Sequence, residues 1–142
     1  SYDFDIWVQR GCRRSGMDKF FGIDINDFDL PQDELAAKLI GTTPTEYAFM
    51  STGVAKGKGL NTSGGILLNV YAPAGTKMMY VEPFSAFGAG AGKSWDGISP
   101  QHSFGHEAEM LLQRGTKFSV TKVEKSGGTI YVDVEVIEQG VY

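Results

Sequence analysis

FGHEAEMLL, residues 104–112, places two carboxylates one residue apart where loop residues give way to an apolar strand. Side chains alternate between the two faces of a strand, so Glu107 and Glu109 are expected to point to the same side. Two carboxylates held that close repel each other unless a cationic group lies between them. The pair therefore predicts either a site for a positively charged substrate or a solvated strand edge, and a stretch this short does not choose between them.

Two further segments carry candidate site residues upstream of this stretch. FDIWVQRG, residues 4–11, predicts a strand with apolar residues at alternate positions and Arg10 continuing their face. A cation at the end of an apolar face is expected to point into a cleft, where the planar fork of arginine suits a phosphate. YAFMSTG, residues 47–53, predicts another short strand that ends in the hydroxyls of Ser51 and Thr52. The alternatives are a surface charge at a strand end and an ordinary exit from strand to turn.

Taken in this order, the three segments resemble the arginine–serine–glutamate class of mono-ADP-ribosyltransferases, the family of clostridial binary-toxin enzyme components and related exoenzymes. That family has an aromatic-Ser-Thr-Ser strand in mid-chain and a loop ending in aromatic-x-x-(Gln or Glu)-x-Glu near its C-terminus. FMST at residues 49–52 is similar to the first pattern and FGHEAE at residues 104–109 to the second. The resemblance runs from Arg10 to about Phe118. Gly53 departs from it, because the family has a second serine there.

The resemblance implies a role for each candidate site residue. Glu109 would hold the ribose 2′-hydroxyl of NAD and stabilise the oxocarbenium-like charge that develops as nicotinamide leaves. Ser51 would fix the Glu109 side chain by a hydrogen bond, and Arg10 would bind a phosphate of NAD. Glu107 would orient an arginine acceptor and draw off its positive charge, because in the family glutamate at this position accompanies arginine acceptors. Phe104 would lie in the acceptor-recognition turn, the alternative being a buried loop anchor.

Further NAD contacts are implied at Gly11 and Thr52, and at Phe84 and Phe87 in a long loop. That loop, residues 82–103, is rich in glycine and alanine but punctuated by aromatic residues. The resemblance implies that it covers the phosphates and the nicotinamide as a lid, and the alternative is a plain surface insertion. Its GAGAGKS segment is not interpreted as a phosphate-binding loop, because the glycine spacing and the flanking elements do not fit one.

Composition limits the class of protein. With 142 residues, 42% of them hydrophobic, the chain is expected to form one domain with a real core, trimmed from a longer chain. A formal net charge of −4 argues against a nucleic-acid-binding surface, which needs a basic patch. Cys12 is the single cysteine, so no internal disulfide forms, and with two histidines it provides too few ligands for a metal cluster. No apolar run is long enough for a membrane span.

Turn signals and alternating segments predict a β-rich domain with one clear helix. Residues 30–41 form that helix, with Pro31 near its start, acidic residues in its first turn and Gly41 at its end. Later strands are predicted at 47–51, 65–71, 77–82, 108–112, 117–124 and 129–137, with turns at 74–75 and 126–128. This spacing favours antiparallel hairpins. The resemblance implies an α+β fold, a mostly antiparallel two-sheet sandwich with few short helices and NAD between the sheets.

The sequence thus predicts an NAD-dependent mono-ADP-ribosyltransferase directed at arginine, with NAD as its substrate and no metal. Two alternatives stay open: an NAD glycohydrolase that uses the same site with water as acceptor, and a non-catalytic β-sandwich binding module. The expected partner is an unidentified target protein. The expected setting is the cytoplasm of a target cell, reached as a secreted toxin, an injected effector or a phage-carried enzyme.

Overall fold

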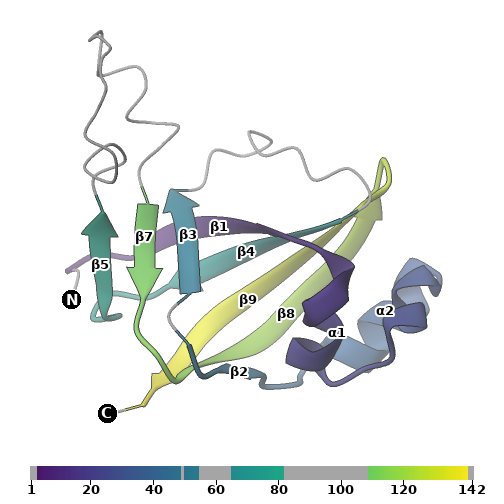
Figure 1. Ribbon diagram of the computed structural model, residues 1–142, viewed down its shortest axis with the longest axis horizontal. Helices are drawn as coiled ribbons and strands as arrows, with labels where there is room; N and C mark the ends of the chain where they lie inside the picture. The colour runs from purple at the N-terminus through teal and green to yellow at the C-terminus, as the bar shows by residue number, and fades with distance from the viewer. Residues whose placement is uncertain (1–2, 49, 55–64, 82–108, 141–142) are drawn as a thin grey trace, which may run out of the picture.

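The longest strands of the described chain, β8 (Thr116–Ser126) and β9 (Thr129–Gln139), have eleven residues each and form a hairpin (Figure 1). The structure is a computed structural model, and it describes residues 3–48, 50–54, 65–81 and 109–140. The two residues between the strands, Gly127 and Gly128, have φ of 56° and 84°, the left-handed values of a tight two-residue hairpin turn. The turn predicted at residues 126–128 is confirmed.

The described residues form a mixed sheet of eight strands in the order β2-β8-β9-β4-β1-β3-β7-β5. The other strands are β1 (Ile6–Cys12), β2 (Thr45–Glu46), β3 (Met50–Val54), β4 (Ile66–Ala72), β5 (Met78–Val81) and β7 (Glu109–Leu112). Most neighbours are antiparallel, as expected. The pair β4 and β9 is parallel, however, which the preference for hairpins did not predict. The reason is that β9 returns to lie beside a strand far upstream in the chain, and local spacing carries no information about such a return.

The sheet is narrowly joined between β1 and β3. Seven residue pairs join β1 to β4, whereas the β1–β3 ladder has only two, Val8 with Val54 and Gln9 with Gly53. Beyond Gln9 the two strands separate, and Figure 1 shows β3, β7 and β5 running side by side across the direction of β1. The expected two sheets are therefore two halves of one hydrogen-bonded sheet, and the predicted α+β class is confirmed.

The core lies on the face of the sheet that three short helices cover. These are α1 (Arg14–Phe21), the 3₁₀ helix η1 (Ile25–Asp29) and α2 (Gln32–Leu39). The predicted helix at residues 30–41 corresponds to α2, which begins directly after Pro31. The buried side chains include Val8, Phe21, Phe28, Leu35, Leu39, Leu68, Val70, Met110, Leu112, Phe118, Val132 and Val134. Aromatic edges join the layers, with the rings of Phe20 and Phe118 centred 5.8 Å apart.

Two predicted strand boundaries were wrong. Phe4 lies before β1 and is 57% exposed, because the neighbouring Asp5 carboxylate accepts hydrogen bonds from the Tyr71 hydroxyl (2.7 Å) and the Ala74 N–H (2.8 Å) and anchors this segment outside the core. The strand expected at 47–51 begins instead at Met50 and continues to Val54. The difference shifts the hydroxyl residues from the end of the strand to its middle.

Candidate active site

Arg10 stands where β1 leaves the ladder with β3. It is the first residue beyond the Gln9–Gly53 pair, it is half-buried, and it faces Leu68 across the β1–β4 ladder. By strand alternation it continues the face of Ile6 and Val8, as the sequence predicted. Gly11 follows it at an exposed position. Arg10 therefore lies beside the point where β1 and β3 diverge, which we call the opening between β1 and β3.

The hydroxyl residues and the second glutamate lie on neighbouring strands across that opening. The β3–β7 register pairs Ser51 with Leu111 and Gly53 with Glu109, so positions 51 and 109 are diagonal neighbours in one ladder. Diagonal positions of an antiparallel pair are within reach of long side chains. The structure therefore brings two predicted catalytic positions together from segments 58 residues apart, the same separation that joins Thr52 to Met110.

Thr52 has a structural partner. Its side chain is 4% exposed, and its hydroxyl donates a hydrogen bond of 2.8 Å to the Met110 carbonyl on β7. Because the bond crosses between the two strands, it holds together the pair that carries positions 51 and 109. The NAD contact that the resemblance implies for Thr52 stays a prediction.

Polar side chains on β1, β4 and β9 lie in register with the Gly53–Glu109 pair, and the sequence did not predict them. Gln9 is 4% exposed, and its amide donates to Asn69 Oδ1 at 2.8 Å. Asn69 in turn donates to Asp133 Oδ1 at 3.0 Å. The register continues this row from Gln9 through Gly53 to Glu109. The available signal was Gln9 itself, a polar residue inside an otherwise apolar strand whose buried amide needs partners.

The pKa of the Cys12 thiol depends on the charges of Arg10 and Glu46. Burial raises the pKa of Cys12, while the Arg10 cation and its hydrogen bond oppose the rise and the Glu46 carboxylate adds to it. Cys12 is half-buried at the end of β1 and packs against the core. The protonated thiol is the favoured form at neutral pH.

Several predicted site residues lie outside the described residues. They are Glu107, Phe104, Phe84 and Phe87, together with the predicted lid at 82–103. Within the described ranges, no group of three or more histidine, cysteine, aspartate or glutamate side chains is arranged to hold a metal ion. None of the helices in those ranges is long and apolar enough to cross a membrane.

The described part of the site has a specific chemical capacity. Three adjacent strands, β1, β3 and β7, carry a cation, a hydroxyl position and a carboxylate position in that order. A cation suits the phosphates of a dinucleotide, and a carboxylate suits a sugar carbon that gains positive charge as its leaving group departs. Strand β3 lies between β1, which carries the cation, and β7, which carries the carboxylate position.

Comparison with known proteins identifies similar sequences and folds. A family model described as ADP-ribosyltransferase exoenzyme matches residues 4–138 of the chain. No curated protein matches the chain by sequence.

Solved structures share the fold at low sequence identity. C3larvin toxin, an ADP-ribosyltransferase from Paenibacillus larvae, has a TM-score of 0.66 at 20% identity, over 96% of this chain and 64% of that one. C3stau2 from S. aureus, solved with NAD, has a TM-score of 0.64 at 20% identity, with 96% and 64% covered. The enzymatic component C2-I of the Clostridium botulinum C2 toxin has a TM-score of 0.58 at 15% identity, with 96% and 32% covered. The chain thus spans about two thirds of the length of the first two.

Proposed function

The chain belongs to the ADP-ribosyltransferase exoenzyme family, and on that premise we propose that it transfers ADP-ribose from NAD to an arginine side chain of a target protein. The family predicted from the sequence is thereby confirmed. The observation that carries the proposed activity is the β3–β7 register, which makes Ser51 and Glu109 diagonal neighbours beside the opening at Arg10. The arginine acceptor, the target protein and action in a target-cell cytoplasm are parts of this proposal.

The proposed reaction breaks one bond and forms one. The bond between nicotinamide nitrogen and ribose C1′ breaks, and neutral nicotinamide leaves with the bonding electrons. Positive charge then develops on the ribose, where the Glu109 carboxylate stabilises it, with Ser51 fixing the carboxylate by a hydrogen bond. Arg10 holds a phosphate of NAD at the opening, which keeps the ribose in place.

Glu107 is assigned to the acceptor. A guanidinium nitrogen attacks C1′, and the proton that it loses passes to the Glu107 carboxylate. The assignment rests on glutamate being the first acid of the pair, since the family resemblance couples that residue to arginine acceptors.

Labelled NAD tests this proposal. The chain is incubated with NAD labelled in its adenylate half and with a protein extract, and protein-bound label and free nicotinamide are both measured. We expect both products, and Glu109→Gln should lower both rates by about a hundredfold or more, because a preorganised charge partner is lost. Glu124→Gln is the matched control, since Glu124 is an exposed carboxylate on β8 that pairs with Lys122 at 3.8 Å. Its rates should equal those of the unaltered chain.

The products separate the alternatives. Nicotinamide without protein-bound label would make the chain an NAD glycohydrolase, and neither product would make it a binding module. Mass spectrometry of the labelled peptides is expected to find ADP-ribose on arginine, and another modified residue would overturn the acceptor assignment.

Glu107→Gln is predicted to separate the two half-reactions. Transfer to arginine should fall steeply because the guanidinium loses its orienting carboxylate, whereas release of nicotinamide to water should largely persist. The ratio of protein-bound label to nicotinamide measures this directly. An equal fall in both would place Glu107 in the NAD site.

A further inference from the structure

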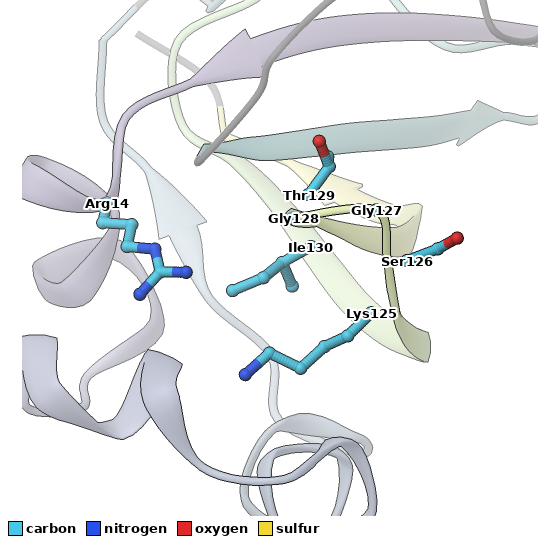
Figure 2. A pocket seen from close by; sticks show the side chains of 7 residues that line it. All are labelled: Arg14, Lys125, Ser126, Gly127, Gly128, Thr129 and Ile130. Atoms are coloured by element: carbon cyan, nitrogen blue, oxygen red, sulfur yellow. The ribbon is translucent and has the colours of Figure 1, made fainter.

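A pocket lies at the turn between β8 and β9, and its lining includes no residue of the opening between β1 and β3. Its volume is about 310 Å³, and it is lined by Arg14 of α1, Lys125, the turn residues 126–128, and Thr129 and Ile130 (Figure 2). We call it the Arg14 pocket. None of these residues belongs to β3 or β7, which carry the proposed catalytic positions. The volume is at the lower end of the range for small-molecule sites, about 300–1,000 Å³.

The Arg14 guanidinium lines this pocket, and one of its N–H groups lacks an acceptor. Its Nη1 donates to Asp29 Oδ1 at 2.7 Å, on the side of the guanidinium away from Nε–H. The Nε atom is buried and has no hydrogen-bond partner among the described residues. Such an orphaned charged N–H is rare, because burial without an acceptor is costly.

Lys125 adds a second cation on the other side of the pocket. Its Nζ donates to the Phe28 and Leu30 carbonyls, each at 2.7 Å, and these bonds fix the ammonium in place. An ammonium has three protons, so two bonds leave one for a ligand. Figure 2 shows the Arg14 and Lys125 side chains extending into the same space from α1 and β8. Arg14 and Lys125 both line this pocket, and no acidic side chain is among its lining residues in the described part of a chain of formal charge −4.

The hairpin turn forms an approachable wall. Gly127 and Gly128 carry no side chain, and a Cβ added at either position would meet no atom within 4 Å. A ligand can therefore come close to the turn backbone. Ile130, 1% exposed, forms an apolar floor. An apolar floor with a few convergent polar groups is typical of ligand sites.

We infer that the Arg14 pocket binds a phosphate group, with the Arg14 guanidinium and the Lys125 ammonium donating hydrogen bonds to its oxygens. A phosphate monoester fits better than a carboxylate, because it presents three acceptor oxygens and close to two negative charges at neutral pH. The source is either free phosphate or a small phosphorylated metabolite. This site does not depend on the proposed transferase activity.

Solution NMR tests the inference without NAD. The ¹⁵N-labelled chain is titrated with inorganic phosphate, and separately with ribose 5-phosphate, at constant ionic strength set with sodium chloride. We expect saturable shifts of the Arg14 Nε–Hε signal and of the Gly127 and Gly128 amides. Equal affinity for the two probes indicates a free-phosphate site, and tighter binding of ribose 5-phosphate indicates a phosphorylated ligand. Shifts that stay linear with both probes would overturn the inference.

Three variants make the test specific. Arg14→Gln should weaken phosphate binding about tenfold or more, as expected for the loss of a charge-assisted hydrogen bond. Arg13→Gln removes the same charge from the exposed neighbouring residue, and should leave the affinity within about twofold. Asp29→Asn removes the competing carboxylate and keeps Arg14, so binding should tighten. Unchanged affinity in Arg14→Gln, with its spectrum showing an intact fold, would refute the assignment.

Discussion

Thr52 illustrates how one hydroxyl can serve the fold beside a site. Because its bond to the Met110 carbonyl is buried and crosses β3 to β7, Thr52→Val is predicted to lower the free energy of unfolding by about 1 kcal/mol. NAD turnover should persist at low temperature. Thr121→Val is the control, since that exposed hydroxyl donates to the Asp133 carbonyl at 3.1 Å. A stable Thr52→Val chain without affinity for NAD would instead support a direct contact between Thr52 and the cofactor.

Cys12 gives a pH-dependent prediction. Because burial raises its thiol pKa, alkylation by iodoacetamide should be slower than that of a free cysteine between pH 7 and 9. Glu46→Gln should speed the reaction, since the Glu46 carboxylate raises the pKa, and Arg10→Gln should slow it further, since the cation lowers the pKa. Mass spectrometry of the alkylated chain over time measures each rate. A rate equal to that of free cysteine would show that the thiol is not desolvated.

The raised pKa of Cys12 also makes the stability of the folded chain depend on pH. The unfolded chain loses the thiol proton at a lower pH than the folded chain does. The contribution of Cys12 to stability is therefore complete below the ordinary thiol pKa and declines as pH rises past it.

Residue identity was enough to propose part of the site. Arg10, Ser51 and Glu109 could be proposed from short motifs because their chemistry is local to each segment, and their roles stay predictions. Gln9 was missed because the partners of its buried amide are distant in sequence: Asn69 is 60 residues from Gln9, and Asp133 is 64 residues from Asn69. No local pattern carries that information.

At the scale of elements, the turn between β8 and β9 depends on its glycines. Gly128 has φ of 84°, so Gly128→Ala is predicted to cost about 1 kcal/mol of unfolding free energy. Gly128→Asn should cost less, because asparagine tolerates left-handed φ in such turns. Urea unfolding followed by circular dichroism gives both values. Equal stability of the alanine and glycine chains would show that the turn relaxes to another conformation.

The elements differ in how well sequence predicted them. The strands at β4, β8 and β9 were located because runs of branched apolar residues end at clear turns. Helix α1 was missed because its eight residues, RSGMDKFF, are too few to show a clear apolar period. Ser15 and Gly16 also have non-helical backbone angles, so the regular part of the helix is shorter still. The helix ends at Gly22, which has φ of 74°. A single glycine in a sequence is not enough to predict such a helix end.

For the whole molecule, the two-pair join between β1 and β3 predicts unequal stability in the two halves. Amides of β3 and β7 should exchange with solvent at least about tenfold faster than those of β9, because opening one half breaks few bonds to the other. Hydrogen exchange read by NMR on the chain without ligand measures this. Addition of NAD should narrow the difference if it bridges the halves. Equal protection of β7 and β9 would show that the short ladder is no weak point.

The place of β9 in the sheet constrains how this protein can be made. It is the last strand of the described chain, yet it lies between β8 and β4 with a neighbour on each side. During synthesis, β4 and β8 therefore leave the ribosome before β9, the strand that pairs with both of them. Until then, one edge of β4 lacks its parallel neighbour, and contacts that span so much sequence form slowly. Protection from aggregation during that interval is a demand that this topology places on the cell that synthesises it.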